Sequence, residues 1–208
     1  MWELCCLSRV SFFLLGMELR ITQYGEPILR EEGKVIETFD DFLRTLVADM
    51  IETMYEAEGV GLAAQQIDQA LMLCVVDIAG YEELGIDFEL DGKRPPLDLI
   101  MPMALVNPVL RKLPSEEVKM EEGCLSFPGI RGEVSRPDLI EVNYQDVDGV
   151  KHCLVTSGWF ARVVQHEYDH LKGILFIDHM ETRYLRRMDT KLKRLKRSSR
   201  DWLNEQAK

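Results

Sequence analysis

The stretch VVQHEYDHLKG, residues 163–173, places two histidines four positions apart with a glutamate directly after the first. In a helix, His166 and His170 would lie one above the other on one face, with Glu167 rotated by about 100°. Two such imidazoles can bind one metal ion, and the carboxylate beside it can take a proton from water. The alternative is a pair of ordinary polar residues on a helix surface. The H-E-x-x-H pattern favours a helix that carries a metal site and needs a third ligand from elsewhere.

The residues around this motif predict its structural setting. Residues 138–157 alternate apolar and polar side chains and include Asp148-Gly149, a pair typical of a hairpin turn. Ser157 then offers a helix cap, and Gly173 can end the helix. Apolar side chains recur between them at helical spacing, at Phe160, Val163, Val164 and Leu171. We therefore expect the metal-binding helix to follow a β-hairpin directly.

Two further segments have periodic patterns. Residues 38–58 repeat apolar side chains every three or four positions, which indicates an amphipathic helix. Thr38 and Asp41 occupy capping-box positions, and Gly59 is placed to end this helix. Residues 71–78, LMLCVVDI, form a short apolar run typical of a buried strand.

Two segments lack such a pattern. Residues 79–103 are polar and contain several Gly and Pro residues, so we expect a long loop there. Residues 1–16, MWELCCLSRVSFFLLG, have neither the basic start and cleavage site of a signal peptide nor the Arg-rich bias of a transit peptide. Met17 opens a conventional start. We expect translation from Met17, with residues 1–16 an extension of no catalytic role.

The composition is ordinary for a soluble globular protein, with 46% hydrophobic and 29% charged residues. No apolar run approaches the roughly 20 residues of a membrane span, so no membrane association is expected. Five cysteines are scattered along the chain without the paired spacing of a disulfide framework. This usage favours a reducing, cytoplasmic setting.

The net charge of −11 is unevenly distributed. Residues 181–208 hold ten Lys and Arg against four acids, a net +6, and residues 1–180 hold fifteen against thirty-two, a net −17. Leu185, Met188, Leu192 and Leu195 keep helical spacing through the basic tail, which predicts an amphipathic helix. A basic helix on an acidic body favours a polyanionic partner such as nucleic acid, although a solvated helix face is the alternative.

Several residues could supply the third metal ligand: His152, His179, a carboxylate or a cysteine. Cys124 lies in EEGCLSFPG, where Gly and Pro indicate a tightly shaped loop or strand edge. The alternative for a lone cysteine is a small buried hydrophobe. Residues 59–66, GVGLAAQQ, carry small side chains that permit close approach to the backbone, or else form a helix end and a flexible turn.

Taken together, GVGLAAQQ, EGCLS and QHEYDH resemble the three signature motifs of the peptide deformylases, in the same order and at comparable separations. YGEPILR, LVNP and LKGILFIDHM are also similar to family sequence. The resemblance covers residues 17–180. It implies an α+β fold in which antiparallel β-sheets pack around a central helix that carries the H-E-x-x-H motif. The basic helix of residues 181–208 would be an addition to this catalytic domain.

The resemblance implies removal of the N-formyl group from the initiator methionine of nascent polypeptides, with release of formate. The metal ligands would be Cys124, His166 and His170. Glu167 would act as the general acid and base. The side-chain amide of Gln66 and the backbone N–H of Leu125 would stabilise the oxyanion. Family members typically use Fe²⁺, and Zn²⁺, Ni²⁺ or Co²⁺ suit the same ligands.

The resemblance also implies how the peptide binds. The substrate would add as a strand between residues 59–61 and residues 127–129. This assigns substrate-binding roles to six residues: Gly59, Val60, Gly61, Leu125, Val163 and His166. The last three, together with Val60, would form the apolar pocket for methionine. The ribosome would be a partner through the C-terminal helix, and we expect a monomer.

Supporting roles are expected for four more residues. Asp169 would orient a metal ligand or the adjacent loop. Gln165 would tether neighbouring backbone. An ion pair between Glu122 and Arg136 would hold the Cys124 segment as a structural contact. Two competing functions stay open at this point: a zinc peptidase with another third ligand, and a non-catalytic ribosome-associated homologue.

Overall fold

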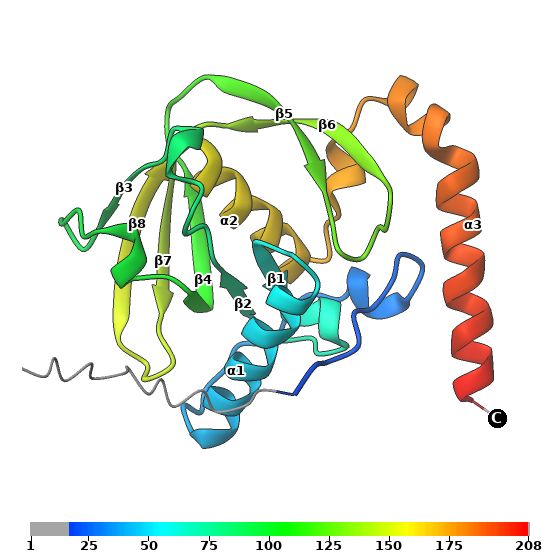
Figure 1. Ribbon diagram of the computed structural model, residues 1–208, viewed down its shortest axis with the longest axis horizontal. Helices are drawn as coiled ribbons and strands as arrows, with labels where there is room; N and C mark the ends of the chain where they lie inside the picture. Colours follow the sequence, from blue (N-terminus) through cyan, green and yellow to red (C-terminus); the bar gives the residue numbers. More distant parts are fainter. Residues whose placement is uncertain (1–16, 208) are drawn as a thin grey trace, which may run out of the picture.

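The computed structural model describes residues 17–207, so the expectations for residues 1–16 lie outside the described part of the chain. The strands are β1 (Gly61–Ala63), β2 (Leu73–Val76), β3 (Asp87–Leu90), β4 (Met103–Lys112), β5 (Glu117–Gly123), β6 (Arg131–Pro137), β7 (Ile140–Gln145) and β8 (Lys151–Ser157). The α-helices are α1 (Asp41–Glu56), α2 (Gly158–Leu171) and α3 (Thr182–Gln206) (Figure 1).

The described strands form two antiparallel sheets. Six of them pair in the order β1-β2-β4-β7-β8-β3, and β5 and β6 form a separate two-stranded sheet. The helix α2 lies between the two sheets (Figure 1). Its apolar side chains, including Phe160 and Val164, join the largest hydrophobic cluster with side chains of β2, β4, β7 and β8. The expected α+β fold around the helix of residues 158–171 is confirmed.

The strand β2 is buried on both faces, which explains its uninterrupted apolar sequence. Cys74 and Val76 belong to the cluster around α2. Leu73 and Val75 belong to a second cluster, built with Met50 and other side chains of α1. Because successive side chains of a strand point to opposite faces, β2 joins the two clusters and confirms the predicted buried strand.

The predicted hairpin before the metal helix is also confirmed. Strands β7 and β8 pair from Ile140↔Thr156 to Gln145↔Lys151. In the turn, the Asp146 carboxylate accepts hydrogen bonds from the backbone N–H groups of Asp148 and Val150, both at 2.9 Å. The polypeptide passes from β8 directly into α2, so the hairpin sets where the helix begins.

The helix ends differ in detail from the sequence-based expectations. Asp40, not the pair Thr38 and Asp41, caps α1, because its carboxylate accepts the Leu43 N–H at 3.0 Å. Ser157 occupies the N-cap position of α2 but makes no side-chain capping hydrogen bond. After α2, Gly173 adopts φ +67°, the left-handed conformation that commonly follows a helix, as expected.

The expectation of one long loop at residues 79–103 was wrong. This segment contains β3 and two short 3-10 turns, Glu82–Leu84 and Leu97–Leu99. Strand β3 extends the six-stranded sheet by pairing with β8, from Asp87↔Ser157 to Leu90↔Leu154. Its polar sequence suits an edge strand, where charged side chains discourage pairing with another chain.

The basic tail is helical, as predicted, and α3 lies along one side of the molecule (Figure 1). Its half-buried apolar side chains, among them Leu185 and Leu192, pack on a third hydrophobic cluster that includes Leu29, Phe127 and Phe176. The Ser199 hydroxyl donates to the Tyr24 carbonyl at 3.0 Å, and Arg20 stacks on the Trp202 ring. Among the described residues, no helix is long and apolar enough to cross a membrane.

Candidate metal centre and active site

Cys124, His166 and His170 converge on one point. Cys124 follows the last residue of β5, and the two histidines project from one face of α2. One potential ligand atom from each residue lies within 4.8 Å of the others. The Cys124 Sγ is 3.3 Å from the His170 Nε2. The structure therefore brings together the cysteine and the two histidines that the three motifs implied, with the spacing of a mononuclear metal site.

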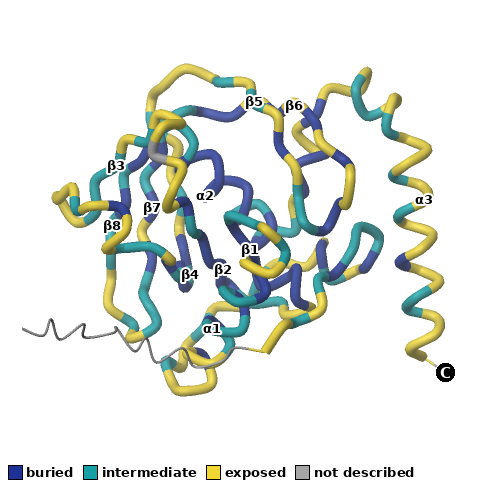
Figure 2. The backbone as a smooth tube through the Cα atoms, viewed as in Figure 1, coloured by how far each residue is buried: buried dark blue, intermediate teal, exposed yellow. Residues whose placement is uncertain are grey.

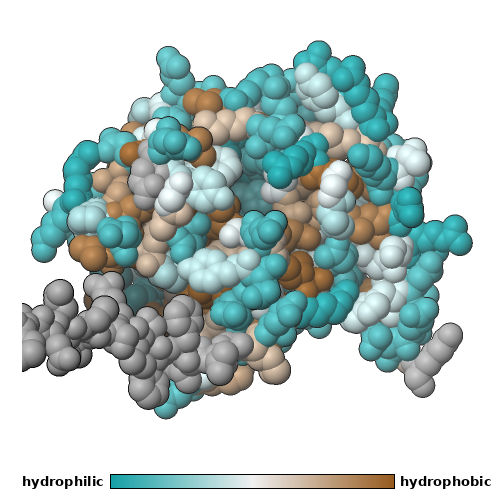
Figure 3. Space-filling model, in the orientation of Figure 1, coloured by the Kyte–Doolittle hydropathy of each residue, from teal (hydrophilic) through white to brown (hydrophobic). Residues whose placement is uncertain are grey.

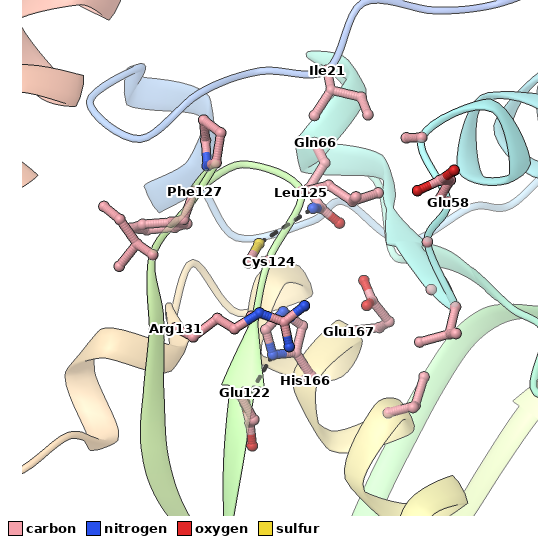
Figure 4. Close-up of a pocket in the computed structure, with 18 of the residues that line it drawn as sticks. Ile21, Glu58, Gln66, Glu122, Cys124, Leu125, Phe127, Arg131, His166 and Glu167 are labelled. Carbon is pink, nitrogen blue, oxygen red and sulfur yellow. Dashed lines mark hydrogen bonds and ion pairs between the residues drawn. The ribbon is translucent and has the colours of Figure 1, made fainter. Parts of the chain in front are cut away.

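Glu122 is bonded to one of these histidines. Its Oε2 lies 2.9 Å from the His166 Nδ1 (Figure 4). Its two oxygens accept from the Arg136 guanidinium at 2.6 and 2.9 Å. Burial alone would raise the pKa of Glu122, but the hydrogen bonds from Arg136 and His166 hold it well below its usual range. An ionised Glu122 keeps the proton of His166 on Nδ1 and leaves Nε2 free to bind a cation. The expected ion pair between Glu122 and Arg136 is present. The contact between Glu122 and His166 was not predicted from the sequence.

Two further charged groups complete this buried network. Arg162 was not singled out from the sequence, yet only 4% of it is exposed. Its guanidinium donates to Glu122 at 3.0 Å and to the carbonyl groups of Val134 and Val118 at 3.1 and 2.6 Å. On the other side, the Asp169 carboxylate accepts from Arg136 at 2.6 Å. Each charge in the network therefore has a partner.

Asp169 and Gln165 act on the surroundings of the site. Asp169 lies 2.8 Å from the His179 Nε2 in addition to its bond with Arg136, so it ties α2 to β6 and to the segment after the helix. The Gln165 Nε2 donates to the carbonyl groups of Pro137 and Ala161 at 3.0 and 3.1 Å. These contacts agree with the expected positioning and tethering roles.

Glu167 contrasts with Glu122. It is only 4% exposed, and its Oε2 is buried without a hydrogen-bond partner in residues 17–207. Burial raises the pKa of its carboxyl group to about 7. A Cβ on Gly61 would come within 2.5 Å of the Glu167 Oε1, so only glycine leaves room for this carboxylate. A carboxylate without a protein partner, beside the three potential ligands, is free to exchange protons with water.

Gln66 is held with its amide nitrogen toward the site. Its Oε1 accepts from the Ala63 N–H at 2.8 Å, which fixes the orientation of the amide. Its Nε2 lies 3.5 Å from the Cys124 Sγ and 3.3 Å from the Ser126 Oγ. The Leu125 N–H makes no hydrogen bond within the described residues. The Gln66 amide thus contacts Cys124, and Leu125 follows it in the sequence, so the two residues predicted to stabilise the oxyanion lie next to one potential metal ligand.

The protonation of the two histidines fits a bound cation. Burial lowers the pKa of His170 well below its usual value, so its imidazole is neutral, as a metal ligand must be. His166 differs: burial opposes its charged form, but hydrogen bonds with Cys124 and Glu122 raise its pKa. The donor set, one thiolate and two imidazoles, thus suits a divalent transition metal.

The site opens into a cavity of about 740 Å³. All six residues expected to bind substrate line it, and so do Phe127, Pro128 and Gly129. The molecular surface has a recess near the centre of the face drawn in Figure 3. Other lining residues were not expected from the sequence: Ile21, Gln23, Glu58, Tyr81, Arg131 and Trp159. They come from segments without a motif, so only the fold identifies them.

Comparisons with known proteins agree with this geometry. Residues 18–185 match the family model described as polypeptide deformylase. A peptide deformylase of Opitutus terrae is 50% identical over 185 residues, covering 88% of this chain and 96% of the relative. That of Methylacidiphilum infernorum is 40% identical over 181 residues, covering 87% of this chain and 94% of the relative.

Solved structures show the same fold. A peptide deformylase of Plasmodium falciparum superposes with a TM-score of 0.75 at 36% identity, covering 87% of this chain and 97% of that one. A peptide deformylase of Arabidopsis thaliana gives a TM-score of 0.76 at 34% identity, covering 90% of this chain and 94% of that one. The family match, these relatives and the shared fold show that the chain belongs to the polypeptide deformylase family, the metal-dependent hydrolases that remove the N-formyl group from nascent polypeptides.

Proposed function

We propose that Cys124, His166 and His170 hold the divalent cation with which this deformylase hydrolyses the formyl group of N-formylmethionyl peptides. One observation carries the proposal: these three side chains meet next to Glu167, whose Oε2 is buried and unpartnered. The ion pairs of Glu122 support it, because they fix the His166 imidazole in the tautomer that a cation requires.

A cation in this position supplies Lewis acidity, which lowers the pKa of water toward neutrality and polarises the formyl carbonyl. We propose Fe²⁺ as the native ion, with Zn²⁺, Ni²⁺ or Co²⁺ able to substitute. Zinc binds this kind of ligand set more tightly than iron. Metal analysis after aerobic purification therefore tests occupancy, and activity after anaerobic loading with each metal tests which ion works.

The side chains of the site then divide the chemical work. Glu167 accepts a proton from the water that attacks the formyl carbon and passes it to the amine as the C–N bond breaks. Formate and a free N-terminus are the products. The Gln66 amide and the Leu125 N–H donate to the formyl oxygen as negative charge develops on it. A donor of this kind typically lowers the barrier by about 3 kcal/mol.

The peptide backbone would bind along β1, an edge strand of the six-stranded sheet. Gly59 and Gly61 line the cavity at this strand and just before it, and residues 127–129 line it as well. Recognition through main-chain hydrogen bonds reads any sequence. Val60, Leu125, Val163 and His166 would form the apolar pocket that selects methionine.

The test is formate release from a formyl-Met peptide by iron-loaded protein prepared without oxygen. We expect Glu167→Gln to lower kcat by about 10²–10⁴-fold while the metal content stays the same. Glu205→Gln, an exposed glutamate on α3, is the matched control and should retain activity. Cleavage of internal peptide bonds would indicate a peptidase instead. Metal binding with no formate release from any formyl peptide would indicate a non-catalytic homologue.

We further propose that the exposed side of α3 binds ribosomal RNA. Its apolar side packs on the body, and its basic side chains are exposed: Arg183, Arg186, Arg187, Lys191, Lys193, Arg194, Lys196, Arg197 and Arg200. Arg186 and Arg194 form no ion pair within the described residues. Such side chains release counterions when they meet phosphate groups.

Ribosome binding measured against salt concentration tests this role. Replacing Arg186, Arg194 and Arg197 together with glutamine should weaken binding and reduce its salt dependence, because fewer counterions are released. Lys151→Gln, an exposed lysine on β8, is the control and should bind as the unmodified protein does. Equal affinity and an equal salt slope for the triple variant would refute the proposal.

The remaining assignments are also proposals. Residues 17–180 would form the catalytic unit and residues 181–208 the ribosome-directed helix, with the protein acting as a monomer in the cytoplasm. The free cysteines Cys74, Cys124 and Cys153 support a reducing compartment. Light scattering at working concentrations tests the monomer, and expression of a chain that starts at Met17 tests whether residues 1–16 affect activity.

A further inference from the structure

The loop between β5 and β6 lies between α2 and α3 (Figure 1). Phe127, Gly129 and Ile130 of this loop line the active-site cavity. Phe127 and Ile130 also belong to the hydrophobic cluster on which the apolar side of α3 packs, and Cys124 contacts the same cluster. One wall of the cavity therefore shares its packing with α3.

This loop depends on neighbouring elements for its position. Strands β5 and β6 pair with each other and with no other described strand. A two-stranded hairpin alone is marginally stable in water, so its end needs support from outside the small sheet. Within the loop, the Phe127 N–H donates to the Cys124 carbonyl at 2.9 Å and the Ile130 N–H to the Phe127 carbonyl at 3.0 Å. These bonds fix the shape of the loop and leave its place in the molecule to packing.

Tyr24 connects α3 to this loop. Ser199, the buried residue of α3, donates through its hydroxyl to the Tyr24 carbonyl at 3.0 Å. The Tyr24 N–H donates to the Ser126 carbonyl at 2.9 Å. The Tyr24 ring stacks on the Phe127 ring, with the ring centroids 4.8 Å apart. Only one residue therefore stands between α3 and the cavity wall along this route.

Two further contacts show that α3 fits closely against the body. A Cβ on Gly25 would come within 2.8 Å of the Lys196 Cα, so glycine allows the helix backbone to approach this turn. The Lys191 Nζ donates to the Gly129 carbonyl at 3.5 Å. Because Gly129 lies in the segment along which the peptide would bind, α3 contacts this segment directly as well as through Tyr24.

We propose that α3 positions the peptide-binding wall of the active site, so that docking of α3 and binding of a formyl peptide stabilise each other. The proposal rests on the proposed function of the site, and it gives α3 a role besides RNA binding. Coupling between two sites is reciprocal. Loosening α3 therefore weakens peptide binding, and a bound peptide holds α3 more firmly on the body.

The first test replaces two half-buried leucines of α3. In the full chain, Leu192→Ala combined with Leu195→Ala removes apolar contacts with the cluster and leaves every residue of the cavity in place. We expect the KM for formyl-Met-Ala-Ala to rise by about 5-fold or more, the lower range of coupling between sites. The kcat should change by less than about 2-fold, because Glu167 and the metal ligands are unchanged.

The matched control is Leu90→Ala combined with Leu110→Ala. These two half-buried leucines pack on the cluster around α2 and do not line the cavity. Urea unfolding measures the stability that each double variant loses. A purely structural role of α3 would lower the amount of active enzyme and leave KM unchanged in both variants. Equal KM for the α3 variant and the unmodified enzyme therefore overturns the proposal.

Hydrogen exchange tests the reciprocal effect without altering α3, so it applies even if the double variant does not fold. In metal-loaded Glu167→Gln protein, saturating formyl-Met-Ala-Ala should slow exchange of the α3 amides by about 5-fold or more and leave that of β3 unchanged. Equal exchange of α3 with and without the peptide refutes the coupling. If the unmodified enzyme releases no formate from this peptide, the proposed function fails instead, which is a distinguishable result.

Discussion

The helices α2 and α3 carry the same types of charged residue in opposite surroundings. Figure 2 shows α2 almost entirely buried and α3 mostly exposed. Around α2, Arg136 and Arg162 are each 4% exposed and both bind Glu122. On α3 the basic side chains are exposed, and their ion pairs are with neighbours on the same helix or at its start, such as Lys193 with Asp189.

The two helices differ in what their charges do. The buried charges around α2 hold neighbouring side chains in place, whereas the exposed charges of α3 are available to bind a partner. A buried ion pair that loses one partner leaves an uncompensated charge in a medium of low polarity, so its geometry is enforced. An exposed pair gains little from its contact and is screened by salt, so its members can exchange partners readily. The first arrangement suits a metal site that must be rigid, and the second suits a surface that binds phosphate groups.

The largest effect is expected at the centre of the buried network. Glu122→Ala leaves Arg136 and Arg162 without their shared carboxylate, and should lower the free energy of unfolding by about 3–5 kcal/mol. It also frees the His166 Nδ1, so metal affinity should fall by about 10–100-fold. Urea unfolding and metal titration measure the two effects. A loss of less than about 1 kcal/mol would mean that Glu122 contributes no more than an exposed ion pair does. The buried network would then not differ from the ion pairs of α3.

The next effect comes from crowding the Glu167 carboxylate without changing any charge. In Gly61→Ala, the new methyl group would lie 2.5 Å from the Oε1, so the carboxylate must move. A displacement of about 1 Å in a reacting group can cost roughly 10²-fold in rate. Steady-state kinetics should show this loss in kcat with the metal retained. Full activity would show that Glu167 tolerates displacement and does not act as a positioned base.

A half-exposed cluster should give an intermediate, pH-dependent effect. The His152 imidazole lies between Asp91 and Asp146, at 2.7 and 3.3 Å. Burial opposes its charged form, but the two carboxylates raise the pKa of His152 above its usual 6.5. The bond with His152 lowers the pKa of Asp91 below 3.8. Burial opposes a low pKa at Asp146, but the Val150 N–H and then His152 hold it below 3.8. The stabilisation is therefore present between about pH 4 and 6.5, and is lost as pH rises through the raised pKa of His152.

Unfolding at two pH values measures this contribution. The difference in unfolding free energy between the unmodified protein and His152→Gln should be about 1 kcal/mol larger at pH 5.5 than at pH 8.5. Using the difference removes the pH dependence of the rest of the molecule. Equal differences at both pH values would show that the imidazole is uncharged in this cluster.

The smallest effect is expected on α3. Asp189→Ala removes the partner of Lys193, an exposed pair one turn apart, at 2.7 Å. Pairs of this kind contribute about 0.3–0.5 kcal/mol, and the contribution falls with salt. Thermal or urea unfolding at low and high salt should therefore differ little from the unmodified protein. A loss as large as that of Glu122→Ala would mean that α3 is held by its charges and not by its apolar side.

Much of the site could be predicted from local sequence. The i, i+4 spacing of His166 and His170 fixes their common face once the segment is helical. Cys124 and Gln66 were assigned to the site only through the resemblance of their motifs to those of the peptide deformylases. The basic helix α3 followed from periodicity alone. Hairpin β7–β8 was readable because alternation and an Asp-Gly turn are both short-range signals.

The remainder depends on contacts between distant residues. Strand β3 was missed because it is only four residues long and gains strand structure by pairing with β8, 68 positions away for Phe88↔Thr156. Arg162 is a residue type that is usually exposed, and its burial depends on Glu122, 40 positions earlier. Tyr81 reaches the cavity because the segment of residues 79–103 folds back to the start of α2, where Gly85 meets Gly158.

The most direct test of the account is X-ray absorption spectroscopy of the metal-loaded protein. With zinc bound, we predict one sulfur ligand at about 2.3 Å and nitrogen or oxygen ligands at about 2.0–2.1 Å, two of them imidazole. In Cys124→Ser the sulfur contribution should vanish. A spectrum of the unmodified protein without a sulfur ligand, or with fewer than two imidazoles, would contradict the central claim that Cys124, His166 and His170 bind one cation.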